Sequence, residues 1–90
     1  MTVAQLSTIY DFCIVNLQRK FGLVLKELRK EKGLSQESLG YQSDIDRTYI
    51  SDIEKGERNI SLKIIKRLSE TLQISLSELF KKIEEFGKHK

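Results

Sequence analysis

The sequence contains no proline, one cysteine and one histidine, and these scarcities exclude several classes of active site. Cys13 has no second cysteine to pair with, so it cannot form an intramolecular disulfide. His89 lies far from Cys13 along the chain, so the two provide neither the ligand spacing of a metal site nor a Cys–His catalytic pair. We therefore expect no metal, no cofactor and no thiol catalysis.

Long apolar runs are also absent. No run approaches the ~20 residues that a membrane-spanning helix requires, and the longest one near the N-terminus is Phe12 to Val15. Residues 1–20 lack both the basic start and the small-residue cleavage site of a signal peptide. These features predict a cytoplasmic protein without a membrane partner, and no small-molecule ligand is evident.

The size and charge of the chain set further bounds. Its 90 residues are enough for one compact domain, and the net charge of +3 permits an anionic partner. The charge is unevenly distributed, because residues 33–60 carry −3 whereas residues 19–32 carry +4 and residues 61–90 carry +3. Bulk electrostatics therefore does not indicate nucleic acid, and any such partner must be inferred from particular side chains.

Apolar spacing predicts helices along most of the chain. The first stripe, at i, i+3, i+4 and i+7, consists of Phe21, Val24, Leu25 and Leu28. It indicates a helix over about residues 17–32 that Gly33 closes. Two later stripes with helical spacing consist of Leu62, Ile65, Leu68 and Leu72, and of Leu76, Leu79, Phe80, Ile83 and Phe86.

Cap residues mark where the remaining helices begin. Ser61 and Ser75 precede the two later stripes, while Ser35 and Asp46 precede two very short helices that must lie side by side. No segment alternates with the period of two that a strand requires. The predicted fold is all-α, a compact bundle of five helices.

The N-terminal residues allow two interpretations. Helical spacing relates Leu6, Ile9, Tyr10, Cys13 and Leu17. They could continue the first helix backwards or form a separate N-terminal helix. We therefore divide the chain into an N-terminal extension or helix, residues 1–18, and a folded domain, residues 19–90, with its central motif at about residues 35–55.

The stretch from Leu34 to Gly56 reads LSQESLGYQSDIDRTYISDIEKG and predicts a short helix, a tight turn and a second short helix. Gly40 can be the small residue where the helices cross, and Asp44 suits the turn because Asp tolerates the left-handed region. The apolar residues that tie both helices to a common core are Leu39, Ile45, Ile50 and Ile53.

The outer face of the second short helix is polar. With Ile50 and Ile53 inside, the residues roughly opposite are Thr48, Ser51, Asp52 and Lys55, with Arg47 on the flank in the first turn. Such a surface suits hydrogen bonding to base edges in a major groove, where Arg pairs most often with guanine. On this chemistry alone, an ordinary solvated helix surface is an equally good interpretation.

Residues Phe21 to Phe80 resemble the phage-repressor (Cro/Xre-type) helix-turn-helix family, which has a lambda-repressor-like fold. The runs that carry the resemblance are FGLVLKELRKEKGLSQESLG, DRTYISDIEKGERN and SLKIIKRLSETLQISLSELF. Within the family, the wording DRTYIS…RN looks most like controller proteins of restriction-modification operons. The resemblance implies a sequence-specific, DNA-binding transcriptional regulator that is not an enzyme. It implies a homodimer on a near-palindromic operator in double-stranded DNA, with recognition helices at about residues 46–55.

The resemblance also assigns roles to individual residues. Gln36 matches the glutamine that contacts DNA and braces the recognition helix, and Arg47, Thr48 and Ser51, with Tyr49 beside them, match groove-facing positions. The positions that contact the DNA backbone are matched by Lys55, Arg58 and Asn59. Two residues depart from the family pattern: Asp44 replaces the usual turn glycine, and Asp52 puts a carboxylate in the groove. Asp52 could accept from a cytosine, orient an arginine or be a bystander.

Two further expectations concern structure and assembly. Arg29 and Glu54 match a family pair that forms a structural salt bridge between the first helix and the recognition helix. The stripe Leu76, Leu79, Phe80 and Ile83 is more apolar than the core needs, and it is the expected homodimer interface. The alternative function is an antitoxin-like or phage-type repressor module whose C-terminal helices bind a partner protein.

Overall fold

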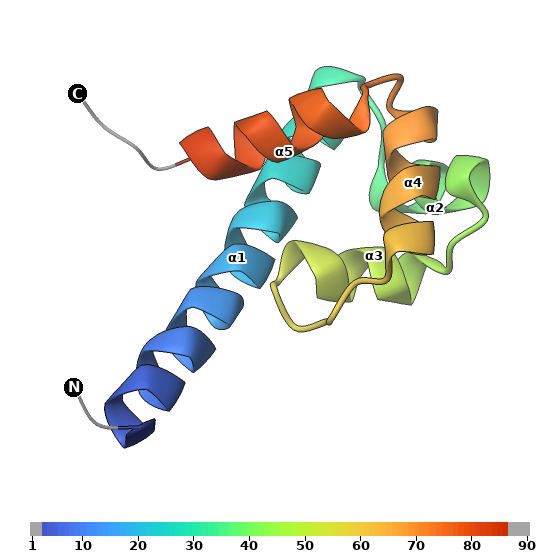
Figure 1. Ribbon diagram of the computed structural model, residues 1–90. Coiled ribbons are helices and arrows are strands. Elements are labelled where there is room, and N and C mark those ends of the chain that lie inside the picture. The colour runs from blue at the N-terminus through green and yellow to red at the C-terminus, as the bar shows by residue number, and fades with distance from the viewer. Residues whose placement is uncertain (1–2, 87–90) are drawn as a thin grey trace.

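The computed structural model describes residues 3–86, with side chains from residue 17 onward. This part of the chain forms five helices and no strand (Figure 1). The helices are α1 (Val3–Glu31), α2 (Gln36–Ser43), α3 (Arg47–Glu54), α4 (Leu62–Thr71) and α5 (Leu76–Glu85). The predicted all-α fold of five helices is confirmed.

The N-terminal segment continues the first helix. α1 runs without interruption from Val3 to Glu31, so from residue 3 onward the extension adds turns to α1 rather than forming a helix of its own. No proline interrupts this stretch, and its one glycine, Gly22, lies inside the helix. Over residues 3–18 the backbone follows the first interpretation, the backward extension of the first helix.

The four predicted N-caps are confirmed. Ser35, Ser61 and Ser75 each accept a hydrogen bond from the backbone N–H three residues later, and Asp46 accepts one from the N–H of Thr48 at 2.7 Å. Each cap satisfies a donor that the first turn of a helix otherwise leaves free. The start of α3 is therefore determined by Asp46.

The turn between α2 and α3 has the backbone conformation that the sequence predicts. Asp44 adopts the left-handed region, with φ of 58°. Its N–H donates to the carbonyl of Tyr41 at 3.3 Å, and the N–H of Ile45 donates to the carbonyl of Gly40 at 2.8 Å. This paired arrangement ends α2 and turns the chain directly into α3.

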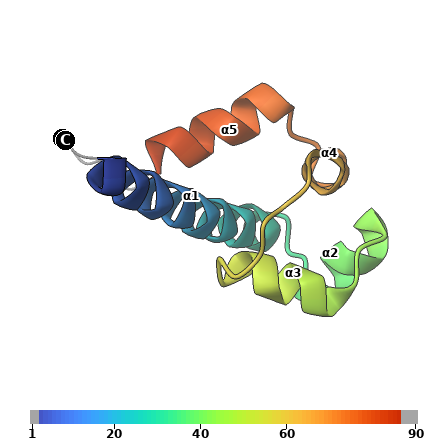
Figure 2. The ribbon, with the colours of Figure 1, turned by 60° about the horizontal axis from the view of Figure 1, so that its bottom comes forward.

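All five helices contribute buried apolar side chains to one core. α1 lies between α3 and α5, and α2 packs against α3 and α4 (Figure 2). The four apolar residues predicted to join both short helices to the core are all buried: Leu39, Ile45, Ile50 and Ile53.

Among the described residues, no helix has the length and apolarity needed to cross a membrane.

Two glycines allow helices to approach closely. A Cβ atom on Gly22 would overlap the carbonyl oxygen of Ile53 and lie 2.8 Å from that of Glu54, so α1 passes directly over the last turn of α3. A Cβ on Gly40 would lie 2.5 Å from the carbonyl oxygen of Ile45, which confirms Gly40 as the small residue at the crossing. At both places the neighbour is backbone, which cannot move aside cheaply.

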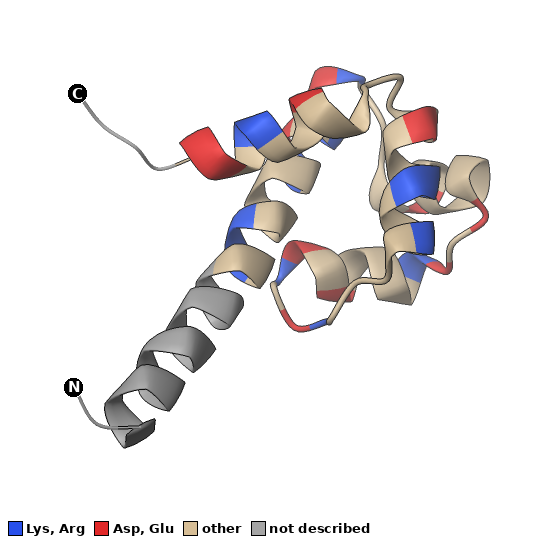
Figure 3. Cartoon of the chain, in the orientation of Figure 1, with Lys and Arg blue, Asp and Glu red and all other residues tan. Residues whose placement is uncertain are grey.

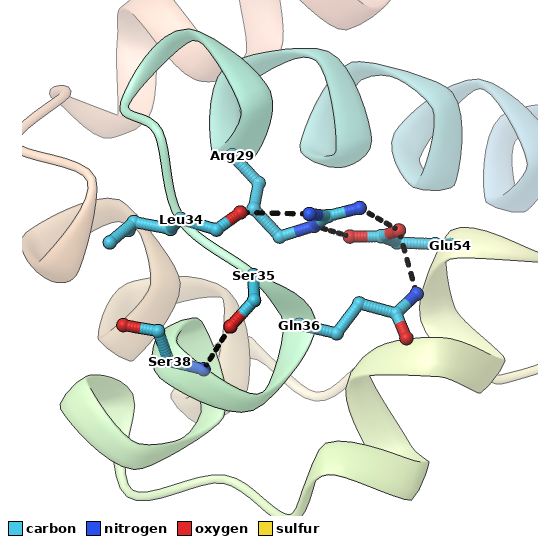
Figure 4. A network of polar contacts seen from close by, with 6 residues as sticks. All are labelled: Arg29, Leu34, Ser35, Gln36, Ser38 and Glu54. Carbon is cyan, nitrogen blue, oxygen red and sulfur yellow. Dashed lines mark hydrogen bonds and ion pairs between the residues drawn. The ribbon is translucent and has the colours of Figure 1, made fainter.

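A buried ion pair joins α1 to α3, as the sequence predicts (Figure 4). Arg29 Nε donates to Glu54 Oε2 at 2.6 Å, and Arg29 Nη2 donates to Glu54 Oε1 at 3.1 Å. Gln36, at the start of α2, donates to the same Oε1 at 3.0 Å, and Arg29 Nη1 donates to the carbonyl of Leu34 at 2.8 Å. The network therefore connects α1, α2 and α3 through one carboxylate.

Hydrogen bonding to Glu54 raises the pKa of Arg29 above its ordinary value, against the opposing effect of burial. The pair is almost inaccessible, since the side chains of Arg29 and Glu54 are 9% and 4% exposed. Both charged groups also form hydrogen bonds to neighbouring residues, Arg29 to the Leu34 carbonyl and Glu54 to Gln36. A buried ion pair is tolerated under this condition. α3 is consequently held in one orientation against α1.

Gly22→Ala is expected to lower the free energy of unfolding by about 1–3 kcal/mol, because the added methyl group overpacks against backbone. Without that clash, the higher helix propensity of alanine would stabilise α1 by about 1 kcal/mol. Urea denaturation shows whether the substitution lowers or raises the free energy of unfolding. Lys26→Ala, at an exposed position one turn away, is the control and should change little. A stabilised Gly22→Ala protein would show that the helices can separate.

Glu54→Leu is expected to lower the free energy of unfolding by about 3–5 kcal/mol, because it leaves the charge of Arg29 buried without a partner. The double variant Arg29→Met/Glu54→Leu should recover much of that loss, since it removes both charges. Glu57→Ala, an exposed carboxylate close by, serves as the control. Equal stability of the single and double variants, measured by urea denaturation, would contradict this account of the pair.

Candidate nucleic-acid interface

The first turns of α3 present polar side chains to solvent. Ile50 and Ile53 have no exposed surface, and this determines which side of α3 faces inward. Arg47, Thr48 and Lys55 are exposed, as expected for the outer face. Ser51 is half-buried, so it lies at the edge of this face rather than at its centre.

The start of α2 lies beside the start of α3. A polar depression between them is lined by Arg29, Ser35, Gln36, Glu37 and Arg47. Gln36, which was expected both to contact DNA and to brace α3, makes the bracing contact through Glu54. The fold thus brings Gln36 and Arg47, eleven residues apart in sequence, to the rim of one concave surface.

Arg58, in the loop after α3, folds back onto that helix. Its Nε donates to Asp52 Oδ2 at 3.1 Å, and its guanidinium carbon lies 4.7 Å from the centroid of the Tyr49 ring. Of the three roles considered for Asp52, the structure shows the carboxylate pairing with an arginine. Tyr49 is half-buried and packs against the core, so its ring forms a firm support for Arg58.

Asn59 is exposed, next to Arg58, and is tied to α1 by a hydrogen bond from Gln18 Nε2 to its Oδ1. Its amide N–H₂ group keeps its donors, so it can still contact a phosphate. Gln18 anchors the loop after α3, and the sequence provided no signal for this role. The same holds for Arg67, whose Nη1 donates to the carbonyl of Asp44 at 3.3 Å and so connects α4 to the turn of the motif.

The expected dimer stripe on α5 divides into two halves. Leu79 and Ile83 are each 1% exposed and belong to the core of the protomer, so their assignment to an intersubunit surface is wrong. Leu76 and Phe80 are each 37% exposed and remain available to a partner. Leu17 is 52% exposed and lines a mainly apolar depression with Phe80. Leu79 and Ile83 are buried because one side of α5 packs on α1 and α4.

Charge around the motif is mixed rather than uniformly basic. Figure 3 shows acidic and basic residues close together on α3 and the loop that follows it. The exposed donors that can meet an anion or a base edge include the guanidinium groups of Arg47 and Arg58, the ammonium of Lys55, the hydroxyl of Thr48 and the amide of Asn59. This arrangement can provide a few directed contacts to a duplex but little nonspecific attraction.

Comparison with known proteins agrees with this geometry. Control protein C.MunI of Mycoplasma sp is 54% identical over 70 residues, covering 77% of this chain and 95% of that protein. The restriction-modification controller C.AhdI from Aeromonas hydrophila is 49% identical with a TM-score of 0.68, covering 70% of this chain and 96% of that one.

The crystal structure of a third similar protein contains DNA. The restriction-modification controller C.Esp1396I, crystallised as a tetramer in complex with its natural 35 base-pair operator, is 39% identical, with a TM-score of 0.72. The match covers 77% of this chain and 91% of that one. A helix-turn-helix family model matches residues 25–79, which include all of α2, α3 and α4. The chain therefore belongs to the helix-turn-helix family.

Proposed function

We propose that this protein is a sequence-specific, DNA-binding transcriptional regulator that acts as a homodimer and controls a restriction-modification operon. The observation that carries the proposal is the outer face of α3, held outward by the buried Arg29–Glu54 pair while Gln36 and Arg47 share one rim. The 54% identity to control protein C.MunI supports the choice of regulator class. Binding in the cytoplasm, and not catalysis, is the proposed activity.

Roles within the interface follow from position. Arg47 and Thr48 lie in the first turn of α3, which is the part of a recognition helix that meets base edges. Arg58 and Asn59 lie beyond its C-terminal end, where the chain would run beside the phosphates. The first group is proposed to read sequence and the second to fix the register of the protein on the duplex.

A dimer is proposed because one recognition helix contacts too few base pairs for useful specificity. Two copies of α3 related by a two-fold axis would enter successive major grooves roughly 34 Å apart on a near-palindromic site. Leu76 and Phe80 on α5, with Leu17 on α1, are the exposed apolar residues proposed to meet the second subunit. Leu17 and Phe80 line one depression, to which α1, α5 and the loop after α3 contribute.

Arg47→Ala should weaken binding to the best operator by about 1–3 kcal/mol and relax the preference at one base pair per half-site. Arg58→Ala should weaken binding to all sequences alike, since a phosphate contact carries no base information. The operator is first selected from random duplex DNA, and both variants are then titrated against it, its single-base variants and unrelated DNA at constant salt. A flat selection profile would contradict sequence-specific binding. Unchanged base preferences in Arg47→Ala would transfer base reading to Thr48 and Ser51.

Phe80→Glu should produce monomers in sedimentation velocity and abolish cooperative binding to a two-half-site operator, because a charge would then be buried at the subunit interface. Phe80 is the residue to change because it is exposed, whereas a charge at Leu79 would disrupt the core. Lys81→Glu, on the adjacent exposed position, is the control for added negative charge. A Phe80→Glu dimer of unchanged stability would place the interface elsewhere.

A further inference from the structure

Asp52 presents a problem for the proposed DNA-binding surface. It lies on α3, the helix proposed to enter the groove, and its side chain is 25% exposed. A carboxylate there repels phosphates and so opposes the binding of any duplex. The contact between Asp52 and Arg58 indicates how this residue can nevertheless favour binding.

Arg58 is held on two sides by residues of α3. Asp52 accepts a hydrogen bond from its Nε at 3.1 Å, and its guanidinium carbon lies over the Tyr49 ring, 4.7 Å from the ring centroid. Tyr49 and Asp52 are three residues apart, so they lie on the same side of α3. Together they restrain the position of the guanidinium group from two sides.

The restrained guanidinium keeps most of its donors. An arginine has five N–H donors, and within residues 17–86 the Nε–H bond to Asp52 is the one hydrogen bond that Arg58 makes. The Nη groups at the far edge are therefore available to a phosphate, which arginine can bind through two parallel hydrogen bonds. The Arg58 side chain is 47% exposed, so this edge is accessible.

We propose that Asp52 and Tyr49 are positioning residues that hold Arg58 ready to bind a DNA phosphate. This inference rests on the proposed DNA-binding function. Asp52 then favours binding through Arg58 even though its own charge opposes it. An arginine that is already restrained loses less side-chain freedom on contact, which corresponds to roughly a two- to tenfold gain in affinity.

A double-variant cycle tests this proposal. Kd for the selected operator and for unrelated duplex DNA is measured for the wild-type protein, Asp52→Ala, Arg58→Ala and the double variant at about 0.1 M salt. Asp52→Ala is expected to weaken binding about two- to tenfold when Arg58 is present. With Arg58 replaced, the same change should have no effect or strengthen binding, because only phosphate repulsion is then removed.

Two matched variants separate positioning from other effects. Glu57→Ala removes a carboxylate next to Arg58 for which no ion pair is found within residues 17–86, and it should not weaken binding. Tyr49→Phe keeps the ring and should keep the affinity for unrelated DNA, whereas Tyr49→Leu should weaken it only when Arg58 is present.

A DNA-free measurement reports on Arg58 directly. In ¹⁵N-labelled protein, the Arg58 Nε–H signal should be protected from solvent exchange in the wild type and lose that protection in Asp52→Ala. An unprotected wild-type signal would overturn the proposal, as would equal fold-changes with and without Arg58, or tighter binding of Asp52→Ala with Arg58 present. Failure of the wild-type protein to bind any duplex would instead overturn the proposed function.

Discussion

The orientation of α3 depends on the buried ion pair between Arg29 and Glu54. This pair lies next to the contact where Gly22 brings α1 onto the backbone of α3, so a polar and a steric constraint act at the same place. A rotation of α3 would leave a buried charge without its partner and push helix backbones apart. Arg47 and Thr48 therefore face outward because of what is buried behind them.

α2 connects this constraint to the outer surface. Gln36 donates to Glu54 from the first turn of α2, and Gly40 allows the same helix to cross the start of α3 closely. The two short helices consequently form one rigid unit, although neither is long enough to be stable alone. Such a unit can present directed donors to a duplex with little reorganisation, which suits recognition by a few contacts.

The proposed interface depends on where its basic side chains lie and not on the net charge of the segment. Residues 33–60 carry −3 overall, yet Arg47, Lys55 and Arg58 all lie on or beside the exposed side of α3. The carboxylates of Glu54 and Asp52 are each directed at an arginine. Position also decides the role of the apolar residues of α5. One side of this helix forms part of the core, whereas the other side leaves Phe80 accessible.

The sequence alone determined the helices, their caps and the left-handed turn at Asp44, because these depend on spacing and on contacts between residues a few positions apart. It also indicated the Arg29–Glu54 pair, through the family resemblance. Only the tertiary structure decided which apolar residues of α5 are covered, since that depends on where α1 and α4 lie. The Asp52–Arg58 contact likewise required the structure, because the chain reverses at Gly56, and helical periodicity makes no prediction across such a reversal.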